Sequence, residues 1–96
     1  MALPPEATIV EAPTFSHLNQ IIRHHVEDEL HRRHGPPIAL RVYINSRMVS
    51  DARQPQNGTA LIAWVRAQGA QDVDIRIDRT DKFLQPPQCA YWLRWD

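Results

Sequence analysis

Residues 38–45 read Ile-Ala-Leu-Arg-Val-Tyr-Ile-Asn, and this stretch decides the fold class of the chain. Apolar side chains occupy every second position, and polar or aromatic side chains lie between them. Because successive residues of a β-strand point to opposite faces, the pattern predicts a strand with one buried face. The buried set is Ile38, Leu40, Val42 and Ile44. The set predicted on the other face is Arg41, Tyr43 and Asn45.

Two further segments repeat this alternation. In residues 72–78 the inward set is Val73, Ile75 and Ile77, and the outward set is Asp74, Arg76 and Asp78. In residues 89–95 the inward set is Cys89, Tyr91, Leu93 and Trp95, and the outward set is Trp92 and Arg94. A fourth, shorter strand is predicted at residues 7–10, and the sequence leaves open whether it joins the sheet.

Helical patterns fill the segments between these strands. Residues 14–34 carry a stripe of apolar side chains at helical spacing (Leu18, Ile22, Val26 and Leu30). Thr14 or Ser16 is the expected N-cap of this helix, and Gly35 follows its end. A second helix is predicted over residues 59–68. Residues 46–57 and 79–88 are then interpreted as long polar connections.

These elements predict an α+β fold in the order βαβαββ, or αβαββ if the first strand does not pair. Only one face of each strand is apolar, so two helices should cover one face of a three- to four-stranded mixed sheet, giving a two-layer sandwich. A right-handed crossover would make strands 38–45 and 72–78 parallel. The chain length of 96 residues predicts a single domain over residues 1–96, with residues 1–6 flexible.

Charge and cysteine content narrow the function classes. Eleven basic and eleven acidic residues give a net charge of zero, which weakens a nucleic-acid interpretation because such proteins usually carry a basic excess. The single cysteine, Cys89, cannot form an internal disulfide. The first six residues do not resemble a signal peptide, and no apolar run approaches the ~20 residues that span a bilayer. We therefore predict a cytoplasmic protein without membrane contact, and the predominance of arginine over lysine indicates a bacterial source.

No catalytic or cofactor motif is present. The three glycines are each assigned to a helix end or turn, so none remains to build a phosphate-binding loop. Cys89 belongs to the inward set of a strand and is predicted to be a buried apolar residue rather than a reactive thiol. We therefore predict a non-enzymatic protein with no catalytic residues and no cofactor.

Histidines recur on the first predicted helix. His17, His24 and His31 are spaced seven residues apart, and His34 lies one turn beyond His31. Pairs at this spacing can reach one metal ion, yet a single helix offers too few ligands for a tetrahedral site. A solvated polar face is the favoured interpretation, with a metal-binding protein as an alternative. His25 falls nearer the apolar stripe and is expected at the boundary of the core.

The open face of the sheet is the favoured binding surface. An exposed tryptophan beside arginine and tyrosine is typical of an interface anchor. The predicted partner is another protein or a second copy of the chain; RNA or single-stranded nucleic acid is the alternative, disfavoured by the carboxylates of Asp74 and Asp78. The predicted partner-binding residues are Arg41, Tyr43, Arg76, Trp92 and Arg94.

A second candidate surface lies at one edge of the predicted sheet. If the two central strands are parallel, both long connections emerge at their carboxyl ends, where ligands of α/β sheets commonly bind. The basic residues of these connections are candidate anion-binding groups: Arg47, Arg53, Arg79 and Lys82. The last strand ends at the chain terminus, so it was also a candidate for an exposed sheet edge.

Overall fold

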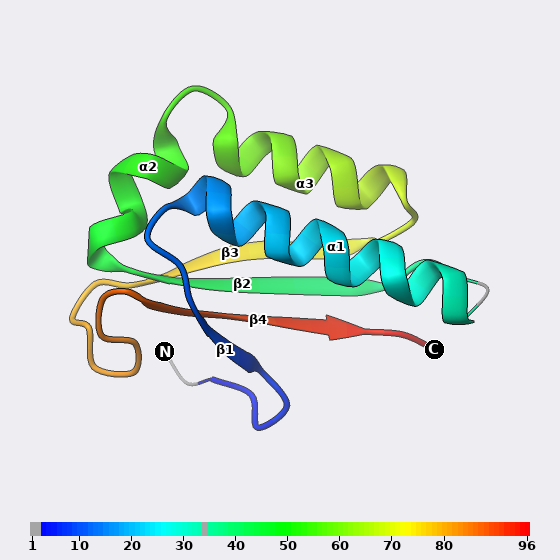
Figure 1. Cartoon of the computed structure of the whole chain (residues 1–96), viewed down its shortest axis with the longest axis horizontal. Coiled ribbons are helices and arrows are strands. Elements are labelled where there is room, and N and C mark those ends of the chain that lie inside the picture. Colours follow the sequence, from blue (N-terminus) through cyan, green and yellow to red (C-terminus); the bar gives the residue numbers. More distant parts are fainter. Residues whose placement is uncertain (1–2, 34) are drawn as a thin grey trace.

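The computed structural model describes residues 3–33 and 35–96, which form an α+β fold of three α-helices, one short 3-10 helix and a four-stranded mixed sheet (Figure 1). The elements in chain order are β1 (Thr8–Glu11), α1 (Phe15–Arg33), β2 (Ala39–Asn45), η1 (Ser46–Met48), α2 (Val49–Arg53), α3 (Asn57–Ala67), β3 (Asp72–Asp78) and β4 (Gln88–Arg94). Among these helices, none combines the length and the apolar character that a bilayer crossing requires. The predicted fold class is confirmed.

The sheet has the strand order β1-β4-β2-β3. β2 and β3 are parallel, as the crossover through α3 predicts, and β4 is antiparallel to both β1 and β2. The first strand therefore joins the sheet, which the sequence left open. The last strand is an interior strand rather than an exposed edge, because β1 returns to pair with it. The two edges of the sheet are β1 and β3.

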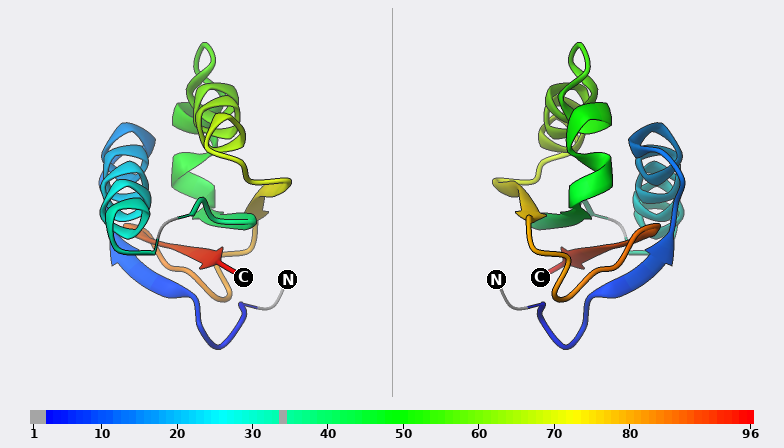
Figure 2. Two further views of the ribbon diagram at one scale, coloured as in Figure 1. Left: turned by 90° about the vertical axis from the view of Figure 1, so that its right-hand side faces the viewer. Right: turned by 90° about the vertical axis from the view of Figure 1, so that its left-hand side faces the viewer.

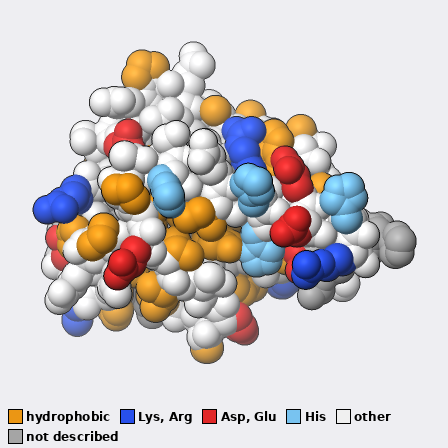
Figure 3. All heavy atoms as spheres, in the orientation of Figure 1, with side chains coloured by type: hydrophobic (Ala, Val, Ile, Leu, Met, Phe, Trp, Pro, Cys, Tyr) orange, Lys and Arg blue, Asp and Glu red, His pale blue; other side chains and the backbone are white. Residues whose placement is uncertain are grey.

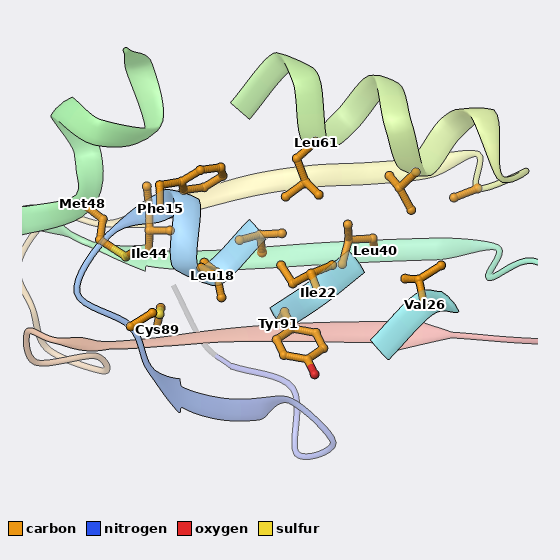
Figure 4. Packing of buried hydrophobic residues seen from close by; sticks show 14 residues of the cluster. Phe15, Leu18, Ile22, Val26, Leu40, Ile44, Met48, Leu61, Cys89 and Tyr91 are labelled. Atoms are coloured by element: carbon orange, nitrogen blue, oxygen red, sulfur yellow. The ribbon is translucent and has the colours of Figure 1, made fainter. Parts of the chain in front are cut away.

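All the helices lie on one face of the sheet (Figure 2). The apolar stripe of α1 packs on the inward side chains of the strands, so that Ile22, Leu40 and Val42 are fully buried. Leu61 and Val65 of α3 complete this core, which Figure 4 shows at close range. Burial of this single continuous set of side chains is the main stabilising contribution to the fold.

The start of α1 and the end of α3 carry the residue types that the sequence predicts there, an N-cap threonine and a terminating glycine. The Thr14 hydroxyl accepts a hydrogen bond from the backbone N–H of His17 at 3.1 Å, so Thr14 caps α1. Gly69 follows α3 with a φ of +120°, and a β-carbon there would lie 2.6 Å from Pro36. Only glycine fits that position without strain.

Residues 46–57 are not the extended polar loop that their composition predicts. Asn45 starts η1 by accepting a hydrogen bond from the Arg47 backbone N–H at 3.0 Å, and Met48 is buried in the core. α2 is tied to α1 because the Phe15 backbone N–H donates to the Asp51 carboxylate. The helical turns form because these long-range contacts stabilise a segment whose polar sequence shows no helical stripe.

The second face of the sheet is covered at one end. Tyr43, Leu84 and Ala90 form a small buried cluster, against which Leu3 and Ala7 pack. Figure 2 shows the N-terminal segment and the loop between β3 and β4 on the side of the sheet away from the helices. The flexibility expected for residues 1–6 stays a prediction, and residues 1–2 lie outside the described part of the chain.

Three outward residues of the predicted open face are buried by this cover. Tyr43 is 2% exposed, Asn45 is fully buried and Asp78 is 4% exposed. The predicted strand faces were right, but the prediction of exposure was wrong for these residues. The loop between β3 and β4 folds back over the strand ends and shields them, which strand alternation cannot reveal.

Candidate functional site

The predicted partner-binding residues lie on neighbouring strands of the second sheet face. Arg41 of β2 is directly opposite Trp92 of β4, and Tyr43 is opposite Arg76 of β3. Side chains at opposite positions of paired strands share a face and come into contact. The sheet register therefore gathers these four side chains into one surface.

Arg41 is held between an aromatic ring and a carboxylate. Its guanidinium lies 5.2 Å from the centroid of the Trp92 ring, and its Nη2 donates to the Asp72 carboxylate at 2.6 Å. The attraction between a cation and the face of an aromatic ring favours this contact between Arg41 and Trp92. The Asp72 carboxylate balances the charge of Arg41.

Arg76 is paired in the same way. Its Nε donates to the Asp74 carboxylate at 2.8 Å, and both side chains are about half exposed, at 48% and 46%. This hydrogen bond raises the pKa of Arg76, and burial opposes it. Each arginine of the surface thus has its own carboxylate, and the surface gains hydrogen-bonding groups without a net positive charge.

These side chains surround a hollow of about 360 Å³. Four predicted residues line it (Arg41, Tyr43, Arg76 and Trp92). Leu3 and Pro4 close it on the side of the N-terminal segment. We call this hollow and its lining the sheet-face site. No sequence pattern predicts the contribution of Leu3 and Pro4, because the approach of the N-terminal segment depends on the tertiary fold.

Tyr43 is nearly buried, whereas the sequence predicts an exposed side chain. Its ring is packed against Leu84 and Ala90, so that it lines the hollow as a nearly buried residue rather than as a projecting anchor. A tyrosine buried in this way offers little apolar surface to a partner, and its hydroxyl is the group that can donate or accept a hydrogen bond. Trp92, which is only partly buried, is the projecting aromatic residue of the site.

The other predicted binding residues lie outside the hollow. Arg94 is exposed at the end of β4, opposite the buried Ala39. The predicted anion-binding residues are all exposed, but none lines the sheet-face site (Arg47, Arg53, Arg79 and Lys82). Arg53 lines a separate groove beside α2 and α3.

The two connections do meet at the carboxyl edge of β2 and β3, as predicted. The backbone N–H and hydroxyl of Ser46 donate to the Asp81 carboxylate at 2.9 and 2.6 Å. This carboxylate adds negative charge between the basic side chains of the two loops. The loop contact therefore explains Asp81 structurally and does not favour an anion site.

Asp78 organises the loop that covers one end of the face. Its carboxylate accepts hydrogen bonds from the backbone N–H groups of Phe83 and Leu84 at 2.7 and 2.9 Å. Burial by itself would raise the pKa of Asp78, but these amides, with that of Lys82 and the Thr80 hydroxyl, hold it below its ordinary value. Asp78 is thus a structural carboxylate that positions Leu84 over Tyr43.

Cys89 is buried, as predicted. Burial raises the pKa of its thiol to about 11, against a weaker opposing effect of the Ala12 backbone. The thiol lies 3.7 Å from the Val10 carbonyl oxygen. A thiol that stays protonated at neutral pH and is shielded from solvent is a poor nucleophile.

The histidines separate into two environments. His25 lies at the core boundary, as predicted, with its Nδ1 hydrogen-bonded to the Tyr91 hydroxyl at 2.6 Å. His17, His24 and His31 are exposed, and Figure 3 shows histidine side chains interspersed with acidic and basic ones along α1. Within residues 3–33 and 35–96, no group of three or more potential ligands is arranged to hold a metal ion. His34, part of the predicted pair with His31, lies outside the described residues.

No family model matches the chain, and no curated protein or solved structure matches it at a significant level.

Proposed function

We propose that this chain is a non-enzymatic protein-binding module whose partner docks on the sheet-face site. One observation carries the proposal: the hollow brings together Arg41, Tyr43, Arg76 and Trp92. Tryptophan, tyrosine and arginine are the residues most enriched among those that dominate binding energy at protein interfaces. Arg94 extends the proposed surface along β4.

The chemistry of the hollow indicates what it would accept. The Trp92 ring, Leu3 and Pro4 offer apolar walls that suit an apolar or aromatic side chain of the partner. The Tyr43 hydroxyl and the guanidinium groups of Arg41 and Arg76 supply hydrogen bonds around it. Their arrangement resembles the centre of a protein interface, where an apolar contact is bordered by polar groups.

Charge pairing favours a protein partner over a nucleic acid. Arg41 and Arg76 each lie within 2.8 Å of a carboxylate, and these carboxylates would oppose a phosphate backbone. Binding of a polyanion depends on unpaired cations that displace counterions. The proposal includes a cytoplasmic location and a bacterial source, supported by the single cysteine and by ten arginines against one lysine.

The test uses two matched tryptophan variants. Trp92 lies beside Arg41 on the open sheet face, whereas Trp64 of α3 lies beside Arg23, 4.9 Å from its ring centroid, and packs partly against the core on the helix-covered side. Proteins captured from bacterial extract by the wild-type chain would be identified, purified and titrated against each variant. We expect Trp92→Ala to weaken binding by roughly thirtyfold, as for a residue that dominates an interface, and Trp64→Ala to leave it unchanged.

Three outcomes would contradict the proposal. Equal loss of binding in both variants would indicate a general effect on the fold, and an unchanged affinity of Trp92→Ala would place the partner elsewhere. A bound RNA whose affinity falls steeply with salt would establish the nucleic-acid alternative.

A further inference from the structure

Strand β3 forms one edge of the sheet, and β2 is its only partner among the described strands. It pairs with β2 over seven consecutive residues, Asp72–Asp78, without an interruption in the register. Natural edge strands are usually protected by short length, proline, a bulge or charged side chains; of these, β3 has only charged side chains, at Asp72, Asp74, Arg76 and Asp78. The opposite edge, β1, is only four residues long. Figure 2 shows β3 at one lateral margin of the sheet, and among residues 3–33 and 35–96 no helix or strand lies beyond it.

The helix-facing side of this edge is apolar and incompletely covered. Val73, Ile75 and Ile77 are all only partly buried. Ile75 and Ile77 also line a groove of about 370 Å³ that runs between β3 and the helices α2 and α3. An unpaired strand edge next to an apolar groove offers both backbone hydrogen bonds and apolar contact to an added strand.

The sequence of β3 is complementary to itself when two copies are antiparallel. With Ile75 opposite Ile75 of a second copy, Asp74 lies opposite Arg76 of that copy, and Arg76 opposite its Asp74. The same register places Val73 opposite Ile77 on the helix-facing side. Opposite charges at facing positions stabilise strand pairing, and like charges oppose it.

The apolar row favours this register over its neighbours. Moving the centre of pairing to Asp74 places Ile77 opposite Gln71, and moving it to Arg76 places Val73 opposite Arg79. The first shift sets two Asp74 carboxylates opposite each other but pairs Asp72 with Arg76, and the second sets two guanidinium groups opposite each other and Asp74 opposite Asp78. A shift that pairs Asp74 with Ile75 would put the helices of the two copies on opposite faces of the sheet.

The remaining facing pair of this register, Asp72 with Asp78 of the second copy, is like-charged, but each carboxylate has partners within its own copy, as Asp74 and Arg76 also do. Asp72 is bonded to Arg41, and Asp78 accepts backbone hydrogen bonds from the following loop.

From these observations we infer that the chain forms a homodimer in which the β3 strands of two copies pair antiparallel about Ile75. The result is one continuous eight-stranded sheet with all helices on one face. A contact of this kind is closed, because the same surface is used on both copies. It does not rest on the proposed protein-binding function, although Arg76 of β3 belongs to both surfaces, because it lines the sheet-face site and faces Asp74 of the second copy in the dimer.

The first experiment measures the dissociation constant of the dimer by analytical ultracentrifugation. We expect the wild type to dimerise and Ile75→Lys, which places a charge in the centre of the apolar row, to weaken the dimer by more than about tenfold. The matched control is Ile9→Lys on the other edge strand, where Ile9 is already 56% exposed. A monomeric wild type, or loss of the dimer through Ile9→Lys alone, would overturn the inference.

Charge exchange tests the register without disturbing the apolar row. Asp74→Arg and Arg76→Asp each create like-charged facing pairs and should weaken the dimer by roughly tenfold. The double variant restores opposite charges and should recover dimerisation. If the double variant loses as much dimer affinity as the two single variants together, the proposed pairing is wrong.

Engineered cysteines test the symmetry axis directly, and they remain informative if Ile75→Lys does not fold. Facing residues of antiparallel strands have α-carbons about 5 Å apart, within reach of a disulfide. Under mild oxidation Ile75→Cys should therefore cross-link to its own copy. Val73→Cys should not, because the two copies of residue 73 would be about 13 Å apart along the strands. Cross-linking of Val73→Cys with no cross-linking of Ile75→Cys would overturn the register.

Dimerisation and partner binding at the sheet-face site can be tested separately with two variants. Trp92→Ala should weaken partner binding by roughly thirtyfold and leave the dimer intact, whereas Ile75→Lys should weaken the dimer by more than about tenfold and leave partner binding intact. Loss of both properties in both variants, with circular dichroism showing folded chains, would mean that the two surfaces are one interface and would overturn the inference.

Discussion

The two faces of the sheet are buried by different means and to different extents. On the helix-covered face, Leu40, Val42 and Ile44 are each at most 1% exposed, and they belong to a core shared by every major element. On the second face, only the end around Tyr43, Leu84 and Ala90 is buried, and the cover is a loop and the N-terminal segment. The first face specifies the fold, whereas the uncovered part of the second is available for binding.

The largest effect is expected in the core of the helix-covered face. Ile22 of α1 is fully buried among side chains from the helices and the sheet. Ile22→Ala should lower the free energy of unfolding by about 3 kcal/mol, because it removes buried methyl groups and leaves a cavity. Chemical denaturation monitored by circular dichroism measures this change. A loss of less than about 1 kcal/mol would mean that this face is not the main source of stability.

A smaller loss is expected from the small cluster on the second face. Leu84 is also fully buried, but it lies in a surface loop that can partly collapse into the space left by a truncation. Leu84→Ala should therefore lower the free energy of unfolding by about 2 kcal/mol, near the lower end for buried leucines. The same denaturation experiment measures it. If Leu84→Ala costs more than Ile22→Ala, the ranking of the two faces is wrong.

The stability contributed by the loop between β3 and β4 should depend on pH, because the Asp78 carboxylate holds this loop in place. Its pKa in the folded protein lies below the unfolded value, so its contribution to stability is complete above about pH 4 and is lost as the pH falls through the folded pKa. Asp78→Asn should lower the melting temperature by a few degrees at pH 7, less than Leu84→Ala does. The gap between wild type and variant should narrow toward pH 2, and a gap that stays constant would contradict this role.

The smallest effect on stability is expected at the exposed part of the second face. Trp92 is only partly buried, and its main contact is the stacked guanidinium of Arg41. Trp92→Ala should lower the free energy of unfolding by no more than about 1 kcal/mol, the contribution of an exposed cation–π pair. Thermal denaturation checks this. A large destabilisation would make Trp92 a structural residue and remove the distinction between stability and binding on this face.

Much of the fold follows from periodicity along the chain. The alternation in residues 38–45 and 72–78 predicts two half-buried strands, and both were found. The stripe through Leu18 and Ile22 likewise predicts α1. These signals are reliable because a side chain's face is set by strand or helix geometry within a few residues.

The candidate site was predicted in part. Arg41, Arg76 and Trp92 were placed on one face by alternation, and the structure brings them to one hollow. The burial of Tyr43 and the contribution of Leu3 were not predicted, because both depend on segments that fold back from elsewhere in the chain. The helical character of residues 46–53 escaped prediction for the same reason, since the contact between Asp51 and Phe15 joins distant positions.

The sequence by itself determined the four strands, the helices α1 and α3, the apolar face of each strand and the burial of Cys89. The tertiary structure alone decided the strand order β1-β4-β2-β3, the cover over Tyr43 and the exposure of β3 as an edge. Periodicity is a property of neighbouring residues, so it is written in the sequence. Strand order and loop cover depend on contacts between residues far apart in the chain, and these form only when the whole core is buried together.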